Sequence, residues 1–264
     1  MPDWETFTEE RDGPVTIVTI NRPERMNAIN STMMAEFERF WPAFDADPHQ
    51  RVAVVTATGD RAFCVGADVK ALAEAGELAE AQQHPDVTRS NRLTPLQNRI
   101  SKPTICAVNG VCAGGGLHFV LDCDVAIAAE EATFLDPHVS VGQVSALESV
   151  MLARRIPLGA ALRMVLAGRH ERIDAARAYE LGLVTEVVPR RRLRDAAIEL
   201  AKKFAAGSPA AIAASRRALW DSYERPLDDA LQHGWDLLRA HWGHPDFQEG
   251  PRAFAEKRDP EWTP

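Results

Sequence analysis

The segment Ala107-Val108-Asn109-Gly110-Val111-Cys112-Ala113-Gly114-Gly115-Gly116 places three consecutive glycines between two apolar runs. The run before it, Pro103–Val108, is typical of a buried strand, and the run after it, Leu117–Leu121, of a helix. Glycines leave backbone N–H groups uncovered at the start of a helix, where the helix dipole is positive. The segment therefore predicts either a site for an anion or developing oxyanion, or simply a tight strand-to-helix turn.

A second turn of the same kind is Ala62-Phe63-Cys64-Val65-Gly66-Ala67-Asp68. It follows the strand-like run Val52–Thr56 and precedes a helical pattern that Asp68 is expected to cap, with the N–H of Ala67 pointing outwards. Two such turns bring two backbone donors together, as oxyanion stabilisation requires. The glycine pattern is neither a P-loop nor a GxGxxG motif, which disfavours nucleotide hydrolysis and hydride transfer.

The rest of the first half alternates strands with helices. Val15–Ile20 alternates apolar and hydroxyl residues, as a half-buried strand does, and Val125–Ala128 is a further core strand. Ser31 is the expected N-cap of a helix. That helix carries Met34, Phe37, Phe40, Trp41 and Phe44 at helical spacing. Strands separated by helices predict a layered α/β fold with crossover connections.

The second half is mainly helical from about residue 147. Pro157 divides the periodic stretch 147–167 into two helices or a kinked one. Asp174 is expected to cap a short helix that ends at Leu181-Gly182, and 184–188 is a short strand. Three amphipathic helices follow, at 193–206, 209–223 and 227–242. We predict a core at 1–200 and a helical C-terminal region at 201–264.

The composition is that of an acidic globular protein. The chain has 264 residues, a formal net charge of −8, 45% hydrophobic and 26% charged residues. An acidic globular chain disfavours nucleic acid or an anionic membrane as the main partner, but is compatible with a small anionic ligand held by local cations. No apolar run reaches the roughly 20 residues of a membrane span. The four cysteines form no CxxC pair, so we expect buried thiols and a cytoplasmic protein.

Six segments in order resemble the enoyl-CoA hydratase/isomerase, or crotonase, superfamily over essentially the whole chain. They are 21–28 (Asn-Arg-Pro-Glu-Arg-Met-Asn-Ala), 62–68, Lys102-Pro103 with 107–116, Cys123-Asp124, Ala132-Thr133-Phe134, and 249–258 (Glu-Gly-Pro-Arg-Ala-Phe-Ala-Glu-Lys-Arg). The resemblance implies an α/β fold with a crotonase-like spiral of ββα units and a C-terminal helical trimerisation region. It also implies a coenzyme A thioester as substrate, with no tightly bound cofactor.

By motif position, the resemblance implies an oxyanion hole made by the backbone N–H groups of Ala67 and Gly115, which stabilise a thioester enolate. The coenzyme A arm is then lined by the segments around the first two motifs, with a lysine from the C-terminal motif near the phosphates. These predicted binding residues are Arg25, Met26, Val65, Ala67, Asp68, Lys70 and Lys257. The implied assembly is a homotrimer or a dimer of trimers. Apolar residues of the C-terminal helices fit that implication: Trp220, Leu227, Trp235, Leu238 and Trp242 exceed what a short helical region buries.

The sequence departs from the family at two positions. Members that hydrate enoyl-CoA resemble one another in two glutamates, where this chain has His118 and His138. Imidazole titrates near neutrality, so one ring can accept a proton while the other donates one. Asp136 is placed to orient His138, and Glu148 is a candidate general base. A metal site at the two histidines lacks a third ligand at a recognisable spacing, so we predict no metal.

Three functions follow from these residues. The first is an acyl-CoA-processing lyase or isomerase of the family, with histidines in place of the glutamate pair. The second is a hydrolase that cleaves a C–C or thioester bond of a β-keto or cyclic acyl-CoA, because a histidine can activate water. The third is a catalytically silent acyl-CoA-binding protein that keeps the oxyanion hole.

Overall fold

Between Val52 and Leu135, successive strands alternate between two sheets. The structure is a computed structural model that describes residues 3–68, 86 and 92–263. In this part of the chain the larger sheet has the order β1-β2-β3-β5-β7-β10 and the smaller one β4-β6-β8-β9. The pairs β3/β4, β5/β6 and β7/β8 each place one strand in each sheet, so the chain advances as a spiral. This arrangement confirms the predicted α/β spiral.

Five of the strands follow predicted runs closely. The strands are β1 (Phe7–Asp12), β2 (Val15–Ile20), β3 (Val52–Ala57), β4 (Ala62–Cys64), β5 (Thr104–Val108), β6 (Val111–Ala113), β7 (Val125–Ala129), β8 (Thr133–Leu135), β9 (Ile173–Asp174) and β10 (Glu186–Val188). Neighbours are parallel except β1/β2 and β8/β9. The short strand β6, which separates β5 from the glycine turn, was not predicted, and neither were β1, β4, β8 and β9.

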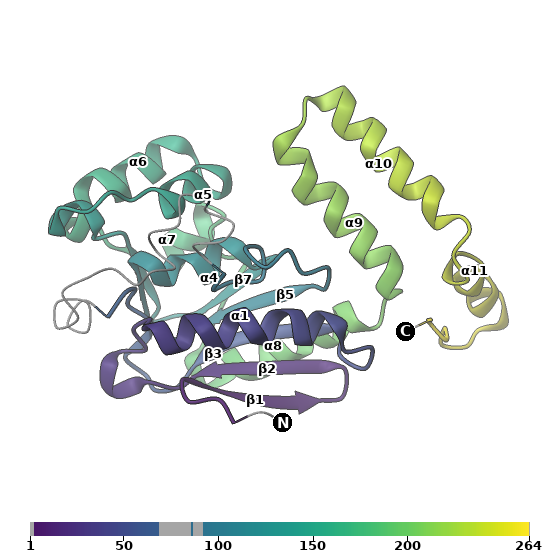
Figure 1. The fold of residues 1–264 in the computed structure, drawn as a ribbon, viewed down its shortest axis with the longest axis horizontal. Helices are drawn as coiled ribbons and strands as arrows, with labels where there is room; N and C mark the ends of the chain where they lie inside the picture. Colours follow the sequence, from purple (N-terminus) through teal and green to yellow (C-terminus); the bar gives the residue numbers. More distant parts are fainter. Residues whose placement is uncertain (1–2, 69–85, 87–91, 264) are drawn as a thin grey trace.

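The helices lie between and after the strands (Figure 1). They are α1 (Ser31–Ala46), α4 (Leu117–Asp122), α5 (Leu147–Arg155), α6 (Leu158–Ala167), α7 (Ala175–Glu180), α8 (Arg190–Ala205), α9 (Pro209–Asp221), α10 (Leu227–His241) and α11 (Asp246–Glu256). Short 3-10 helices are η1 (Pro23–Arg25), η3 (Gly114–Gly116), η4 (His138–Val141), η5 (Gly168–His170) and η6 (Ser222–Glu224). No helix in the described part is both long and apolar enough to cross a membrane.

The period of two along β3 divides the core into two layers. Val52 and Val54 face the layer that α8 covers with Ala197 and Ala201. Their neighbours Ala53 and Val55 face the opposite layer, which contains the aromatic residues of α1. Every residue of β3 is buried, as expected for a parallel strand covered on both faces. The predicted continuous apolar strand therefore lies at the centre of the molecule.

The start of α1 differs from the prediction by one residue. Asn30, not Ser31, is the N-cap: its side-chain oxygen accepts the N–H of Met33 at 2.9 Å. Both residue types favour this position, but Asn30 has the extended backbone of a cap and Ser31 already lies in the helix. The other end signals are confirmed, because α5 and α6 are separated at Pro157 and Asp174 caps α7.

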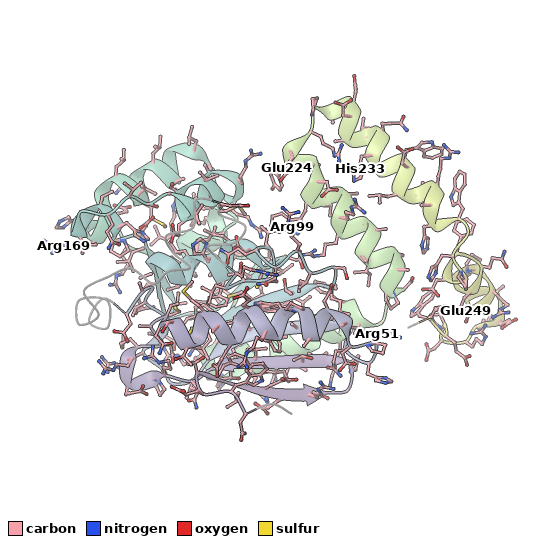
Figure 2. The ribbon with its side chains drawn as sticks, viewed as in Figure 1. Arg51, Arg99, Arg169, Glu224, His233 and Glu249 are labelled. Carbon is pink, nitrogen blue, oxygen red and sulfur yellow. The ribbon has the colours of Figure 1, made fainter. Side chains whose placement is uncertain are left out.

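The C-terminal helices extend away from the sheets (Figure 1). Arg216 and Trp220 of α9 both donate to the carboxylate of Asp124, from Nε at 2.7 Å and Nε1 at 2.6 Å. Trp220 is therefore half-buried against the core rather than exposed as we expected. Other apolar residues of this region remain uncovered in the single chain: Leu219, Leu227, Leu231, Trp235, Leu238 and Trp242. Figure 2 shows His233 and Glu249 on the same extension, distant from the sheets.

The division at residue 200 stays a prediction, and it falls inside a helix. α8 runs through this position and packs Ala201 and Ala205 against the larger sheet. The packed core therefore continues to Ala205, and the extension begins with α9. The predicted buried thiols are confirmed, because all four cysteines are free and buried.

Candidate active site

Two backbone turns meet beside the smaller sheet. The turn after β4 pairs with Ile29: the N–H of Ile29 donates to the Gly66 oxygen at 2.8 Å, and the N–H of Asp68 to the Ile29 oxygen at 2.9 Å. Along an extended strand, successive N–H groups point to opposite sides. The Ala67 N–H therefore points away from Ile29. Ala67 is exposed, so this donor is open to a ligand.

The glycine turn supplies the second donor. Gly115 lies in the first turn of η3, where N–H groups have no partner within the helix. A Cβ on Gly115 would lie 3.8 Å from the Ala67 nitrogen, and one on Gly66 would lie 2.9 Å from the Gly115 nitrogen. In the described part of the chain, neither the Ala67 nor the Gly115 N–H makes a backbone turn or cap bond. The two amides are thus neighbours with free donors.

Asn27 and Arg22 support the first of these turns. Asn27 has a positive φ of 55°, which asparagine tolerates better than most residues. Its side chain accepts the N–H of Arg22 at 2.9 Å and donates to the oxygens of Thr58 and Ala62. Arg22 in turn pairs with Asp68 at 3.3 Å and donates to the Ala28 oxygen. These bonds fix the segment that carries Ile29 to the Ala67 turn.

Histidine 118 follows the glycine turn on α4 and is 5% exposed. Its Nε2 lies 3.1 Å from Oε1 of Glu148, the second residue of α5. Its Nδ1 lies 3.4 Å from Nε2 of Gln97 and 3.8 Å from Oδ2 of Asp122. Glu148 lies in the first turn of α5, where the positive end of the helix dipole stabilises a negatively charged carboxylate.

His138 lies near the same carboxylate oxygen. Its Nδ1 lies 2.6 Å from Oδ1 of Asp136, which also accepts the hydroxyl of Ser145 on Oδ2. Its Nε2 lies 3.8 Å from Oε1 of Glu148. A Cβ on Gly114 would lie 3.5 Å from its Cε1, so the ring stands next to the glycine turn. Glu148 therefore lies between the two predicted histidines.

The shifts in pKa match this arrangement of charges. Burial lowers the pKa of His118, but the hydrogen bond and charge of Glu148 outweigh it and raise the pKa above its usual value. The hydrogen bond to Asp136 raises the pKa of His138. Burial raises the pKa of Glu148, whereas the bond and charge of His118 bring it below its usual range. Burial raises the pKa of Asp122. The environment thus favours an ionised Glu148 beside two rings whose pKa values are raised.

The predicted coenzyme A residues are not all brought together. Arg25 is exposed, while Met26 and Val65 are partly exposed near the Ala67 turn. Asp68 is buried and paired with Arg22, and Lys70 lies outside the described residues. Lys257 ends α11, which in the single chain lies far from α4 (Figure 1).

Several members of this site were not predicted from the sequence. Asp122 is four residues after His118 on one helix, a spacing that predicts a shared face. Asn27 lies within a quoted motif, and its residue type suits a positive φ. Gln97 has no such signal, because it reaches His118 only through the fold. Among residues 3–68, 86 and 92–263, no group of three or more His, Cys, Asp or Glu side chains is arranged for a metal ion.

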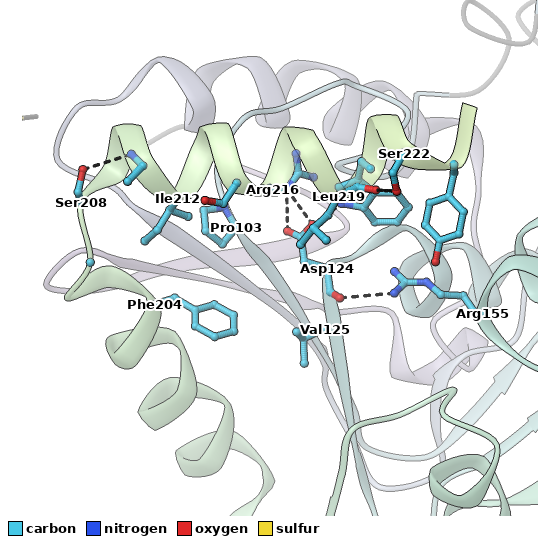
Figure 3. A pocket seen from close by; sticks show the side chains of 15 residues that line it. Pro103, Asp124, Val125, Arg155, Phe204, Ser208, Ile212, Arg216, Leu219 and Ser222 are labelled. Carbon is cyan, nitrogen blue, oxygen red and sulfur yellow. Dashed lines mark hydrogen bonds and ion pairs between the residues drawn. The ribbon is translucent and has the colours of Figure 1, made fainter. Parts of the chain in front are cut away.

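A cavity of about 750 Å³ lies apart from these residues, between α9 and the core (Figure 3). It is lined mainly by apolar side chains such as Phe204, Ile212 and Leu219, together with Arg155 and Arg216. None of the predicted site residues borders it. The cavity belongs to the junction of the C-terminal extension rather than to the histidine cluster.

Comparison with known proteins identifies the family. A sequence model of the enoyl-CoA hydratase/isomerase family matches residues 10–264. The chain is 35% identical to (E)-benzylidenesuccinyl-CoA hydratase of Thauera aromatica over 257 residues, which cover 96% of this chain and 97% of that protein. It is 33% identical to a probable mitochondrial enoyl-CoA hydratase of Dictyostelium discoideum over 258 residues, 97% of this chain and 90% of the relative.

Solved structures agree with the sequence matches. An enoyl-CoA hydratase/isomerase from Mycobacterium paratuberculosis has a TM-score of 0.89 and 39% identity, with 99% of each chain covered. An enoyl-CoA hydratase from Bacillus anthracis has a TM-score of 0.89 and 29% identity, with 98% of this chain and 99% of that one covered. Sequence and fold therefore agree that this protein belongs to the enoyl-CoA hydratase/isomerase family.

Proposed function

We propose that the protein converts an acyl-CoA thioester by stabilising its enolate at the N–H groups of Ala67 and Gly115. His118, His138 and Glu148 then move the proton. The observation that carries this proposal is the position of Glu148, whose Oε1 lies 3.1 Å from one ring nitrogen and 3.8 Å from the other. Buried ionisable groups with shifted pKa values next to free backbone donors are typical of catalytic sites.

The backbone pair accounts for the electrostatic half of the reaction. When a proton leaves the carbon next to the thioester, negative charge collects on the carbonyl oxygen. Two N–H groups already fixed in place can stabilise that charge without reorganisation. The bonds of Ile29 to Gly66 and Asp68 hold the Ala67 turn before any ligand arrives. The site thus needs no side chain for this step.

The histidine cluster accounts for the proton-transfer half. Asp136 holds the ring of His138 through Nδ1, which leaves Nε2 for exchange of a proton. His138 also stands next to Gly114, one residue before the proposed donor Gly115. An imidazole titrates nearer to neutral pH than a carboxylate does, as an acid–base group requires. His138 is therefore placed to exchange a proton near the thioester carbonyl.

The substrate class rests on the family and on the names of relatives. One relative is named for a benzylidenesuccinyl-CoA and another, from Citrobacter koseri and 36% identical, is named carnitinyl-CoA dehydratase. Both names describe coenzyme A thioesters that gain or lose water. We propose that the segments around Met26 and Val65 contact the coenzyme A arm, with Arg25 and Lys70 as cations for it. The thioester is a substrate, and the proposal includes no tightly bound cofactor or metal.

A hydrolase of a β-keto or cyclic acyl-CoA is the second candidate. The Asp136–His138 pair favours it, because a carboxylate on Nδ1 leaves the other ring nitrogen able to activate water. A silent acyl-CoA-binding protein is a third candidate. The burial of His118, His138 and Glu148 argues against a catalytically silent protein. Burying charged groups costs folding free energy, and binding of an acyl-CoA at backbone donors does not require these groups.

We propose further that the chain assembles as a homotrimer or a dimer of trimers. Leu227 is 74% exposed, Leu231 64% and Trp235 47%, and they share the helix α10. An uncovered apolar face of this kind favours contact with another protein surface. Assembly is also the arrangement that can bring Lys257 to a coenzyme A phosphate, because α11 lies far from the site of its own chain (Figure 1).

The reaction class is tested with the purified protein and two substrates. We expect turnover when it is incubated with crotonyl-CoA or with a β-keto acyl-CoA and the products are followed by mass. Gain of water on the first supports a hydratase, and cleavage of the second supports the hydrolase. Binding of both without any product would contradict the proposed catalysis and leave the silent protein.

Replacing either histidine tests the proton-transfer half. His118→Ala and His138→Ala should each lower kcat about 10²–10⁴-fold, the usual contribution of a positioned acid or base. Binding of the acyl-CoA, measured by calorimetry, should persist, because the oxyanion donors are backbone groups. His170→Ala is a suitable control, since His170 lies in η5, outside the cluster. Full activity of both cluster variants would show that these histidines are structural.

Gly66→Ala tests the backbone half. Gly66 has a φ of +88°, and a Cβ there would press on the Gly115 nitrogen at 2.9 Å. We expect kcat to fall about 10²–10³-fold, as when an oxyanion donor is lost. Gly182→Ala is the matched control: it has a φ of +80° but nothing within 4 Å of the added carbon. Both variants should lose stability, about 1–2 kcal/mol for the left-handed backbone, but equal losses of activity would contradict the oxyanion hole.

Light scattering at micromolar concentration tests the assembly. We expect the mass of three or six chains of 29.1 kDa. The double variant Leu231→Glu/Trp235→Glu places two charges on the uncovered face of α10 and should reduce that mass. A monomer for the unaltered protein would contradict the proposal.

A further inference from the structure

The amide of Gln97 has only one orientation that satisfies its neighbours. Its Oε1 accepts the backbone N–H of Leu93 at 2.9 Å and that of Thr94 at 3.1 Å. Only the oxygen of a glutamine amide can accept these two bonds. The NH₂ group is therefore the end that faces Nδ1 of His118, at 3.4 Å.

This orientation determines which nitrogen of His118 carries the proton. The NH₂ group of Gln97 can donate a hydrogen bond to Nδ1 only if Nδ1 has a free lone pair. Nδ1 of His118 must therefore be unprotonated. In the neutral ring the proton then resides on Nε2, which faces Oε1 of Glu148 at 3.1 Å. The bond Nε2–H to Glu148 and the bond from Gln97 to Nδ1 support the same tautomer.

Asp122 is the group that would favour the other tautomer. Its Oδ2 is 3.8 Å from Nδ1, beyond hydrogen-bond distance, and it accepts the Thr94 hydroxyl at 2.6 Å. The remaining ionisable groups that face His118 are Glu148 of α5 and His138 of η4. Glu148 binds the Nε2 side, and His138 repels a second proton on the ring. Of Gln97 and Asp122, Gln97 is therefore the nearer to Nδ1.

The neighbours of His138 favour the opposite tautomer. Its Nδ1 is 2.6 Å from the Asp136 carboxylate, so in the neutral ring the proton resides on Nδ1 and Nε2 has the lone pair. A bare Nε2 cannot donate to Glu148, in agreement with a separation of 3.8 Å rather than a hydrogen bond. Both rings turn Nε2 towards one carboxylate, but one presents a proton and the other a lone pair.

We propose that Gln97 is a positioning residue that holds His118 in the Nε2–H tautomer, opposite to the tautomer that Asp136 imposes on His138. Within the proposed function, on which this assignment of roles rests, His138 is the base that removes the substrate proton. His118 is the acid of the pair, whose Nε2 proton is held on the side of Glu148. Gln97 touches no reacting atom and acts only through His118.

The ¹⁵N spectrum of the protein with labelled histidine tests this assignment directly. The His118 signals are identified by their loss in His118→Ala, and those of His138 by their loss in His138→Ala. Above the titration of both rings, we expect an unprotonated Nδ1 and a protonated Nε2 for His118, and the reverse for His138. A protonated Nδ1 in neutral His118 would overturn the proposal.

Gln97→Glu is the variant that separates positioning from mere structure. Glutamate has nearly the same shape and keeps an oxygen for Leu93 and Thr94, but offers Nδ1 an acceptor instead of a donor. The titration midpoint of His118 should rise by about 1–3 pH units, the usual effect of an adjacent opposite charge. Its Nδ1 should be protonated at pH 7, while the spectrum of His138 stays close to that of the unaltered protein. An unchanged midpoint would overturn the role of Gln97.

These measurements do not require turnover, so they fail or succeed independently of the proposed function. If the spectra show the expected tautomers but neither coenzyme A thioester reacts, the tautomer assignment is correct and the proposed catalytic function is wrong. If both substrates are inert and neutral His118 is protonated on Nδ1, both are wrong. Gln97→Met provides the structural control: it removes the NH₂ and the oxygen together, and should free Nδ1 without adding a charge.

Discussion

The close contact of two backbone turns, 64–67 and 113–116, is the constraint on which the rest of the site depends. A Cβ on Gly116 would overlap the carbonyl of Cys64, and one on Gly66 would press on the Gly115 nitrogen. Only glycine allows backbones to approach this closely. Because α4 begins directly after η3, this contact also determines where His118 enters the site. The contact between the two turns thus places both N–H donors and His118.

The charges beside this contact balance one another in pairs. Glu148 faces His118, and Asp136 faces His138, so each buried carboxylate has a ring that can hold a positive charge. An isolated buried charge would cost several kcal/mol. The partners come from η4, α4 and α5, and Glu148 lies near both rings. A protonated His138 therefore opposes protonation of His118, but less strongly than Glu148 favours it.

Those parts of the fold that depend on local pattern could be predicted from the sequence. Val52–Thr56 is continuously apolar because β3 is covered on both faces, and Pro157 separates two helices because it cannot continue one. Adjacent cap residues were harder, since Asn30 and Ser31 both suit the position and backbone angles decide between them. The contact of Gln97 with His118 could not be predicted, because the two residues are 21 positions apart and meet only once the chain has folded.

The two halves of the site differ in what holds them. The backbone donors are fixed by β4 and by η3, whose neighbours are buried in the core. Of the proton-transfer residues, His118 lies on α4, which is buried throughout. His138 lies on η4, which in the described chain buries no side chain, and Glu148 lies on α5, which buries only Glu148 and Leu152. Hydrogen bonds rather than packing therefore set the geometry of His138. Substitutions in η4 and α5 can change the proton chemistry without disturbing the sheets, whereas a side chain added at Gly66 or Gly116 strains the contact between the two turns. For this reason the glycines predict the family, and only the side chains around Glu148 can specify the reaction.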